Sequence, residues 1–369
     1  MAGVAFHSKE LLVIFLAVSS FVVNCCPPPG RAALLAFKSA LHEPYIGIFN
    51  SWTGNDCCHN WYGVSCDPET HQVAEITLRG KSEDPIFQRA HRIGYMTGFI
   101  SPAVCKLPHL SSLTLTDWEG ISGEIPRCST LLPFLRILDL TGNKILGEIP
   151  RDIGKLHRLF VLNIADNYVS GPIPGSIGNL SSLMHLDVRN NRISGPIPGC
   201  FGRLHMLRRA LLSGNQISGT IPSSITRVYR LTDLDLSTNQ ISGPIPASLG
   251  KMPDLSTLNL DFNRFSGVIP ASLLTSGVNN LNLSKNSLEG KIPDAFGPKS
   301  YFMVLDLSYN KLSGPIPRTL SGTSYIGYLD LSHNNLCGKI PAGSPFDHLD
   351  ASSFESNKCL CGKPLLNAC

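Results

Sequence analysis

The residues best suited to chemistry are acidic, and they recur at nearly even intervals along the chain. In each case the acid directly follows a leucine: Asp139, Asp187, Asp235, Asp306 and Asp330, with Asn163, Asn259 and Asn282 in the same register. Paired carboxylates are the groups that cleave glycosidic bonds. Because these acids recur with a repeat, hydrogen bonding from coil to coil with a serine column (Ser237, Ser308, Ser332) explains them better. We therefore expect no enzyme and no catalytic residue.

A second candidate for chemistry is the string Gly80-Lys81-Ser82, which resembles part of a phosphate-binding loop. Such a loop needs a glycine five residues before Gly80, where Glu75 stands, and a helix directly after it, where the sequence reads SEDP. Without the helix N-terminus there is no cradle for an anion. We expect an exposed loop and no cofactor. The net charge of +4 includes no run of like charges, so no basic stripe indicates nucleic acid.

The elements that position these residues belong to a repeat. The motif G-x-I-P occurs ten times at steps of 24 residues, with one step of 23, and begins at Gly123, Gly147, Gly171, Gly195, Gly219, Gly243, Gly267, Gly290, Gly314 and Gly338. From Gly147 on, an asparagine stands four residues before each glycine, preceded by L-x-x-L-x-L as in Leu231, Leu234 and Leu236. This period and pattern are the signature of the leucine-rich repeat.

The repeat predicts how each coil is built. In L-x-L, Leu234 and Leu236 face inward while Asp235 and Ser237 face outward. The asparagine stands where the chain leaves the strand, and its side-chain amide can form hydrogen bonds with backbone groups in the turn. Stacked from coil to coil, these amides should form a ladder. One coil cannot bury its aliphatic residues alone, so neighbouring coils stabilise one another. We count ten clear coils and a degenerate one before them; one coil has Trp118 in place of the asparagine.

Composition and termini favour a secreted, single-domain solenoid. Apolar residues make up 43% of the 369 residues and charged residues 16%. Residues 1–25 read as a signal peptide, because the apolar stretch at 11–23 is short for a membrane span. The alternative is an N-terminal membrane anchor. We expect an N-terminal cap at 26–72, repeats at 73–336, a cysteine-rich C-terminal cap at 337–369, and no membrane span in the mature chain.

Twelve cysteines, gathered toward the two ends, indicate an oxidising compartment. A solenoid exposes its core at both ends, and disulfides stabilise small caps. Metal binding is the rival interpretation of the CC and CLC strings, but histidines at zinc spacing are missing. We expect no metal.

The cap sequences resemble a known family. FNSWTGNDCCHNWYGVSCD at 49–67 resembles the N-terminal cap of plant leucine-rich repeat proteins, and residues 334–369 resemble the C-terminal cap of polygalacturonase-inhibiting proteins. With the insertion at 79–105, the whole chain is similar to the DNA-damage-repair/toleration type. The resemblance implies a plant-type right-handed superhelix with a second narrow sheet, and disulfides Cys26–Cys57, Cys58–Cys66, Cys337–Cys359 and Cys361–Cys369. We add Cys105–Cys128, from similar places in adjacent coils; Cys200 stays unpaired.

The front cap also contains a predicted helix. Leu34, Phe37 and Leu41 lie at helical spacing, and Pro44 would end the helix. Trp52 and Trp61 are expected to pack under it, although a binding role for them is the alternative.

Residues that vary against the repeating background mark the candidate binding face. Aromatic and charged side chains flank the concave strands at His185, Arg189, Arg209, Asp233, Asp261, Phe262, Lys285, Tyr309, Tyr328 and His333. Such residues on an open sheet suit recognition, and ordinary surface variation is the alternative. Sequons occur at Asn179, expected on the convex side, and at Asn282, on a concave strand.

These observations predict a secreted, extracellular or cell-wall plant protein that binds on its concave face. Its partner would be a protein, such as a microbial hydrolase or a receptor ectodomain, or a wall polysaccharide. Inhibition of a microbial wall-degrading enzyme or a part in defence signalling would follow. The alternative, from the family name, is an indirect role in DNA-damage toleration.

Overall fold

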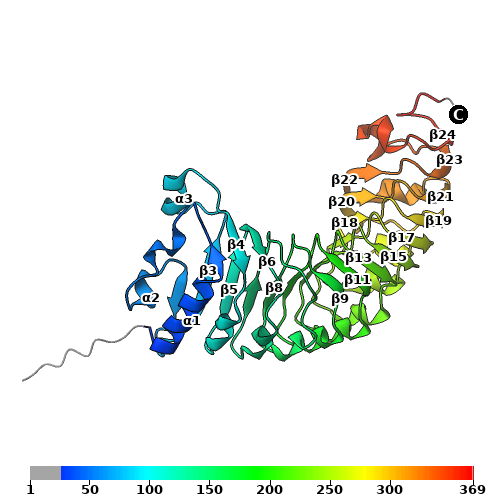
Figure 1. Ribbon diagram of the computed structural model, residues 1–369. Helices are drawn as coiled ribbons and strands as arrows, with labels where there is room; N and C mark the ends of the chain where they lie inside the picture. Colours follow the sequence, from blue (N-terminus) through cyan, green and yellow to red (C-terminus); the bar gives the residue numbers. More distant parts are fainter. Residues whose placement is uncertain (1–25, 368) are drawn as a thin grey trace, which may run out of the picture.

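The protein is a solenoid of stacked coils that bends into an arc, as the ribbon in Figure 1 shows. The computed structural model describes residues 26–367 and 369. The predicted leucine-rich repeat fold is therefore confirmed. The predicted signal peptide, residues 1–25, lies outside the described residues.

One long sheet lines the concave face of the arc. Its twelve strands stand in the order β2, β3, β5, β7, β8, β10, β12, β14, β16, β18, β20 and β22, and all are parallel except β2. Their bounds are Val64–Cys66, Val73–Arg79, Ser112–Thr116, Ile137–Asp139, Val161–Asn163, His185–Asp187, Arg209–Leu211, Asp233–Asp235, Thr257–Asn259, Asn280–Asn282, Tyr301–Asp306 and Tyr325–Asp330. From β5 to β22, residues 23 to 25 apart in sequence are therefore neighbours on this sheet, as His185, Arg209 and Asp233 are.

Two narrower sheets complete the strand architecture. The G-x-I-P half of each coil forms a nine-stranded sheet of β9, β11, β13, β15, β17, β19, β21, β23 and β24, at Ser170–Pro172, Arg192–Pro196, Gln216–Gly219, Gln240–Gly243, Arg264–Gly267, Ser287–Lys291, Lys311–Gly314, Asn335–Lys339 and Cys359–Cys361. A three-stranded sheet near the N-terminus contains β1, β4 and β6, at Leu41–His42, Met96–Phe99 and Glu119–Ser122.

Helices are short and lie away from the concave sheet. The α-helices are α1 (Pro28–Lys38), α2 (Cys57–Asn60), α3 (Pro85–Ala90) and α4 (Ala271–Leu274). The 3-10 helices η1 to η11 span Ile48–Ser51, Pro102–Lys106, Arg127–Leu131, Ile153–Lys155, Gly175–Asn179, Gly199–Arg203, Ser223–Arg227, Ala247–Lys251, Arg318–Gly322, Phe346–His348 and Ala351–Ser353. In Figure 1 the helices of the repeats form the outer, convex side.

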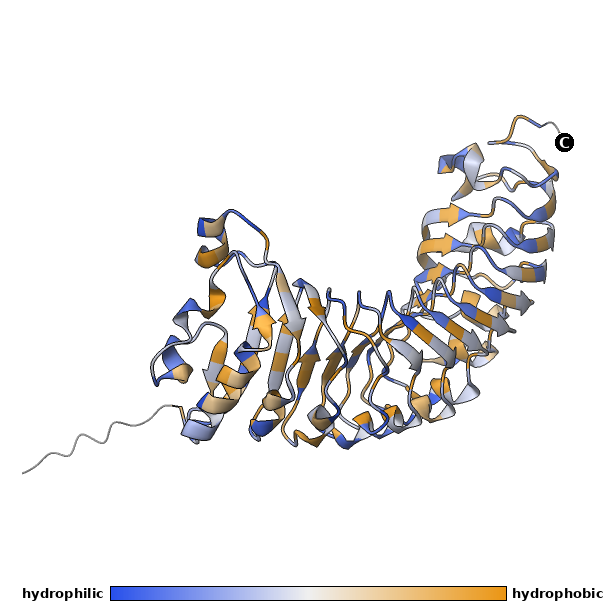
Figure 2. Cartoon of the chain, viewed as in Figure 1, coloured by the Kyte–Doolittle hydropathy of each residue, from blue (hydrophilic) through white to orange (hydrophobic). Residues whose placement is uncertain are grey.

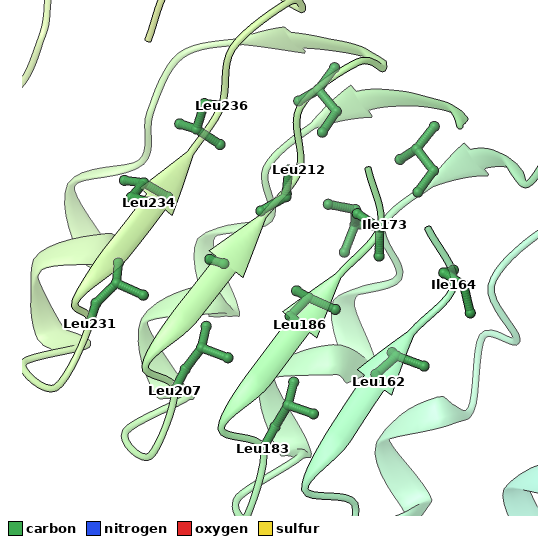
Figure 3. Close-up of a cluster of buried hydrophobic side chains, with 14 of the residues drawn as sticks. Leu162, Ile164, Ile173, Leu183, Leu186, Leu207, Leu212, Leu231, Leu234 and Leu236 are labelled. Atoms are coloured by element: carbon green, nitrogen blue, oxygen red, sulfur yellow. The ribbon is translucent and has the colours of Figure 1, made fainter. Parts of the chain in front are cut away.

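The core is a continuous column of aliphatic side chains inside the coils. Leu234 and Leu236 are fully buried, and so are Ile241 and Leu249 on the other walls. Figure 3 shows the same leucine positions recurring from coil to coil, and Figure 2 shows hydrophobic residues returning in every coil. Each such side chain contributes about 1.5–3 kcal/mol by burial, and it does so only because a neighbouring coil covers it.

The asparagine ladder also forms as predicted. The amide of Asn239 donates to the carbonyls of Leu212, Leu236 and Ser237 at 3.0–3.1 Å, and its oxygen accepts from the Ile217 amide at 3.0 Å. One amide thus bridges two coils at buried backbone groups that would otherwise lack partners.

Trp118 replaces the asparagine in one coil and takes over half of its role. Its indole nitrogen donates to the Leu78 carbonyl of the preceding coil at 3.0 Å, across the insertion. An indole offers no acceptor. The next ladder asparagine, Asn143, is also only half used: its amide donates to Leu115, while its side-chain oxygen has no hydrogen-bond partner among the described residues.

The N-terminal cap differs from prediction at the end of its helix. Helix α1 ends at Lys38, so the placement of Leu41 on its face is wrong. Leu41 instead belongs to β1 and pairs with Gly98 of the insertion. The two segments can approach this closely because Gly98 has no side chain; a side chain there would collide with the Ala40 carbonyl. Trp52 and Trp61 are buried and stacked at 5.2 Å between ring centroids, as core residues.

Disulfides join cysteines near both ends of the solenoid. The pairs are Cys26–Cys57, Cys58–Cys66, Cys105–Cys128, Cys337–Cys359 and Cys361–Cys369, which are the pairs expected from the sequence. Within the described part of the chain, Cys200 is the free cysteine. Its thiol lies 2.9 Å from the Gly175 carbonyl, where Ser224 one coil later bonds Gly199 in the same way.

Candidate functional site on the concave sheet

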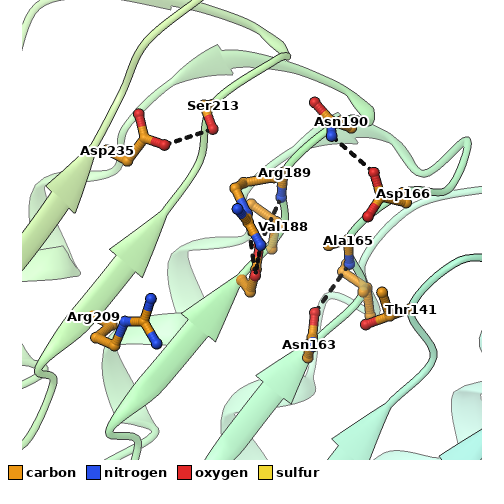
Figure 4. Close-up of polar contacts among 12 residues, drawn as sticks. Thr141, Asn163, Ala165, Asp166, Val188, Arg189, Asn190, Arg209, Ser213 and Asp235 are labelled. Atoms are coloured by element: carbon orange, nitrogen blue, oxygen red, sulfur yellow. Dashed lines mark hydrogen bonds and ion pairs between the residues drawn. The ribbon is translucent and has the colours of Figure 1, made fainter. Parts of the chain in front are cut away.

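The aspartate column is held mainly within single coils, which corrects the expected coil-to-coil bonding. Asp235 accepts from the backbone amide and hydroxyl of Ser237 two residues on, and Asp306 accepts likewise from Ser308. A bond between coils runs from the Ser213 hydroxyl to Asp235 at 2.8 Å (Figure 4). These local turns form because a short carboxylate reaches its own backbone more easily than a neighbouring coil. The column therefore shapes the end of each strand.

Four of the predicted residues form a polar cluster on β10, β12 and β14 and just after β10. Arg209 binds Asp233 at 3.0 Å, and His185 lies beside Arg209 in the sheet. Arg189 binds the buried carboxylate of Asp187 through two nitrogens at 2.8–3.2 Å (Figure 4). This hydrogen bonding raises the pKa of Arg189. The sequence analysis missed Asp187 as the partner that fixes Arg189.

The surroundings of His185 favour its neutral form. Burial lowers its pKa, and the positive charges of Arg209 and Arg189 lower it further. A neutral imidazole beside two guanidiniums offers a hydrogen-bond acceptor as well as a donor. The cluster thus presents an exposed arginine edge with a fixed geometry.

Four other predicted residues form what we call the rim ladder: Phe262, Lys285, Tyr309 and His333. They follow consecutive strands β16, β18, β20 and β22 at the edge of the concave sheet. The Lys285 nitrogen lies 3.8 Å from the Phe262 ring centre and 5.5 Å from that of Tyr309. Tyr309 and His333 are stacked at 3.9 Å. The ladder is a continuous row of rings and one cation.

The rim ladder occupies an unusual backbone conformation. Its residues have φ between 52° and 54°, the left-handed region. The equivalent positions in earlier coils are glycine, a tolerant Asp or Asn, and in one coil threonine: Gly142, Gly214, Asp117, Asp166, Asn190 and Thr238. Bulky side chains are strained there, and strain of this kind gathers at functional sites. Phe262 and Tyr309 nevertheless keep 49% and 46% of their surface exposed.

Of the last two predicted residues, Asp261 directly precedes Phe262 of the ladder, and Tyr328 lies on β22 in the strand column that contains His185, Arg209 and Asp233. Burial raises the pKa of the Asp261 carboxyl to about 6; the charges of Asp235 and Asp306 add to the effect, and Lys285 opposes it. The Tyr328 hydroxyl lies 3.4 Å from Asp330, and burial together with that charge raises its pKa. The structure thus gathers the ten predicted residues along one face, in a polar cluster and a separate aromatic group.

Sequence reasoning missed three exposed residues at the opposite edge of the last coils. Tyr301 and Tyr325 are stacked at 5.0 Å, with Met303 exposed nearby on β20. Their strands are six residues long rather than three. The spacing of these two tyrosines, 24 residues or one repeat apart, could have predicted that their rings lie side by side.

The two sequon asparagines differ in accessibility. Asn179 is exposed at the end of η5 on the convex side. Asn282 is half-buried on β18, and its side-chain oxygen accepts from the amide and hydroxyl of Ser284. Ser284 is itself the third residue of that sequon.

The remaining sequence motifs are structural. Lys81 of the Gly-Lys-Ser string lies 3.4 Å from Glu119 and 3.9 Å from Asp117. Cys57, Cys58 and Cys66 bring their sulfurs within 4.8 Å of one another, but all three sulfurs are bonded in disulfides. Among the described residues, no helix has the length and apolar character that a membrane crossing requires.

Comparison with known families agrees with this geometry. Residues 29–67 match the leucine rich repeat N-terminal domain, and residues 133–193, 157–217, 211–265 and 276–336 match the leucine rich repeat, which covers more than half of the chain. The chain belongs to the leucine-rich repeat family. Leucine-rich repeat proteins of plants are its relatives.

Two curated relatives match over part of their length. A segment of 139 residues is 60% identical to the DNA damage-repair/toleration protein DRT100 of Arabidopsis thaliana, covering 37% of each chain. A polygalacturonase inhibitor of Vitis vinifera is 34% identical over 136 residues, covering 36% of each. The matched segments thus span little more than a third of either relative. This chain is thus a plant leucine-rich repeat protein related to both.

A solved structure matches more of the chain. It is the leucine-rich repeat ectodomain of the membrane receptor kinase GASSHO1/SCHENGEN3 from Arabidopsis thaliana, in complex with CASPARIAN STRIP INTEGRITY FACTOR 2. The TM-score is 0.75 at 32% identity, over 85% of this chain and 36% of that one.

Proposed function

We propose that this chain is a secreted plant recognition protein that binds a protein or wall-associated ligand on its concave sheet. In this proposal, residues 1–25 are removed on secretion and the repeats at 73–336 stand between caps at 26–72 and 337–369. The rim ladder carries the proposal. Four consecutive coils place exposed rings and a cation where the backbone favours glycine, and packing of the core does not require them there.

The polar cluster supports the same conclusion. Arg189 and Arg209 are each oriented by a carboxylate, so they lose little side-chain entropy when a partner binds. Aromatic and arginine side chains dominate the energy of protein interfaces. The cluster and the rim ladder lie on one sheet, so a single partner surface can contact both.

The test is affinity capture from plant and fungal wall extracts, with the secreted chain as bait. The comparison bait is Phe262→Asn/Tyr309→Asn, which removes two rings and suits the local backbone. A matched control, Leu146→Ser/Val268→Ser, removes two exposed apolar side chains elsewhere. We expect proteins retained by the wild type and the control but lost from the comparison bait. Equal retention by all three baits would contradict the site.

Inhibition of a microbial wall-degrading enzyme is the finer form of this proposal, suggested by the relative named as a polygalacturonase inhibitor. Purified fungal polygalacturonase should lose activity with the wild type and retain it with the double variant. Full activity in both mixtures would leave the alternative of a receptor ectodomain as partner.

A second candidate, a role in DNA-damage toleration, is favoured by the 60% identity to the relative of that name. The disulfides argue that such a role would be indirect, because they suit a compartment without DNA. Fractionation that finds the mature chain in the nucleus or plastid, with reduced cysteines, would favour this candidate over ours.

We also propose that Asn179 carries an N-glycan and Asn282 does not, since the Asn282 side chain is held by Ser284. Peptide mapping after enzymatic deglycosylation distinguishes the two sites. A glycan on Asn282 would obstruct the concave sheet and would contradict the proposed binding face.

A further inference from the structure

A groove lies on the N-terminal cap, away from the concave sheet. Its volume is about 870 Å³, within the range of ligand-binding sites. Residues of three separate segments line it, within 45–51, 59–62 and 84–90, and the last segment belongs to the insertion. Figure 1 shows α2 and α3, which contribute to the second and third segments, at the N-terminal end of the arc. We call this site the cap groove.

The first segment of the cap groove is held in place by one carboxylate. The two oxygens of Glu43 accept hydrogen bonds from the backbone amides of residues 45–48 at 2.6–3.4 Å. The Tyr45 ring on this loop is 53% exposed, and the Arg92 guanidinium lies 5.1 Å from its centre. An exposed ring on a fixed loop offers a stacking surface that loses little freedom when a ligand binds.

The cap and the insertion are joined by a hydrogen bond at the cap groove. The Tyr62 hydroxyl donates to the Asp84 carboxylate at 2.6 Å. This bond lowers the pKa of Asp84, and burial together with the Asp84 charge raises the pKa of Tyr62. Phe87 fixes α3 from behind, because it is buried with its ring centre 6.2 Å from that of Trp118. The groove is therefore formed before any ligand arrives.

Polar side chains in the cap groove remain free to bind a ligand. Asn50 and Asn60 are exposed, and within the described part of the chain their side-chain amides have no hydrogen-bond partner. Arg89 donates from Nε to the Pro85 carbonyl at 3.3 Å, but no carboxylate of the described residues lies within ion-pair distance of it. An amide both donates and accepts, and a guanidinium donates. The groove thus offers donors and acceptors together.

The charges that line the cap groove are balanced. Asp84 and Arg89 supply one charge of each sign, and His59 is hydrogen bonded to Asp56 outside the groove at 3.1 Å. No excess charge therefore selects a polyanion or a basic peptide. The residues that line the groove belong to helices and loops and not to strands. They offer no sheet edge to which an extended peptide could add.

We propose that the cap groove binds a short stretch of a neutral polysaccharide. Sugar hydroxyl groups both donate and accept hydrogen bonds, which suits the free amides of Asn50 and Asn60 beside Arg89. The apolar face of a sugar ring can pack on the exposed ring of Tyr45. The rim ladder follows strands β16 to β22, so the two sites are separate and a saccharide and a protein partner can be bound together.

The experiment measures binding of the whole disulfide-bonded chain to cellohexaose, mannohexaose and galactohexaose, and to the acidic hexagalacturonate, by titration calorimetry at low and high salt. The groove variant is Tyr45→Ala/Asn60→Ala, and Arg89→Gln changes the insertion side independently. The matched control, Tyr229→Ala/Asn335→Ala, removes an exposed tyrosine and an exposed asparagine from the repeats.

We expect a neutral hexasaccharide to bind with an affinity that salt leaves unchanged. The groove variant should weaken this binding about tenfold, and Arg89→Gln should weaken it about threefold. The control should stay within about twofold of the wild type.

Several results would overturn the proposal. One is the absence of saturable binding by all three neutral sugars at millimolar concentration, and another is an equal loss in the groove variant and the control. Tighter, salt-dependent binding of hexagalacturonate would assign the groove to an acidic ligand, and displacement of the sugar by a mixture of unfolded peptides would assign it to peptides. The Phe262→Asn/Tyr309→Asn variant should bind the neutral sugar like the wild type, so failure of the proposed protein-binding face leaves this result unaffected.

Discussion

Phe262 holds an exposed ring on a backbone that favours glycine or asparagine, with φ of 52°. Replacing it by asparagine should relieve roughly 1 kcal/mol of strain and remove a cation–π contact with Lys285 of similar size. We therefore expect Phe262→Asn to change the free energy of unfolding by less than about 1 kcal/mol. Urea denaturation measures it.

The control for this prediction is three residues away. Phe265 is fully buried in the same coil, and Phe265→Ala should cost about 3–5 kcal/mol by opening a cavity. If Phe262→Asn destabilised the protein as much as Phe265→Ala, the rim ladder would be a structural element rather than a binding surface.

Asp261 makes stability depend on pH. Its carboxyl pKa rises from 3.8 to about 6 on folding, so the folded chain binds this proton more tightly than the unfolded chain does. Stability is then highest below the unfolded pKa and falls as pH rises toward 6. Allowing for solvent screening, Asp261→Asn should stabilise the protein by about 1 kcal/mol at pH 7 and by much less at pH 4, close to the unfolded pKa.

Unfolding free energies at the two pH values test this prediction. Asp254→Asn, at an exposed aspartate three residues before β16, serves as the control. A benefit of Asp261→Asn that is equal at pH 4 and pH 7 would mean that the carboxylate charge is not the cause.

At the scale of the structural element, the asparagine ladder connects each coil to the one before it. Asn239→Ala leaves three carbonyls without their side-chain donor and the Ile217 amide without its acceptor. We expect a loss of about 3 kcal/mol, measured by urea denaturation. Asn335→Ala on exposed β23 should cost little. A small effect at Asn239 would show that water replaces the ladder.

The repeating elements were predictable because the same residue types recur at the same positions in each coil. The leucines, the asparagine ladder and the strand direction follow from spacing alone. The exceptions depend on contacts between distant segments: Leu41 leaves its helix because Gly98 of the insertion pairs with it. Trp118 keeps the ladder through an indole that reaches Leu78 across the insertion. The aspartates bond within coils because the two-residue turn is shorter than the step between coils.

At the scale of the whole molecule, the caps protect the ends of the core. Removing the C-terminal bridge by Cys337→Ser/Cys359→Ser should cost about 2–4 kcal/mol. Because each coil contacts only its neighbours, hydrogen exchange should increase first in β22 and β23. Cys200→Ser is the control, since serine makes the equivalent bond at Ser224. Uniform loss of protection along the chain would contradict local unraveling.

The candidate site was only partly predictable at this scale. All ten residues proposed for the concave face lie along it, because period and alternation decide which way a side chain points. The contacts between these side chains could not be predicted from the sequence. The stacking of Lys285 on Phe262, for example, depends on the left-handed backbone conformation that both residues adopt.

The one-coil step between neighbouring strands has a consequence for how binding preferences could be redesigned. Each coil contributes one side chain to a row such as the rim ladder, while the buried leucines and asparagines remain unchanged. Deleting or duplicating one 24-residue unit within these coils would shorten or lengthen the rim ladder by one residue. The number of repeat units would then determine the length of polymer or peptide that the molecule prefers.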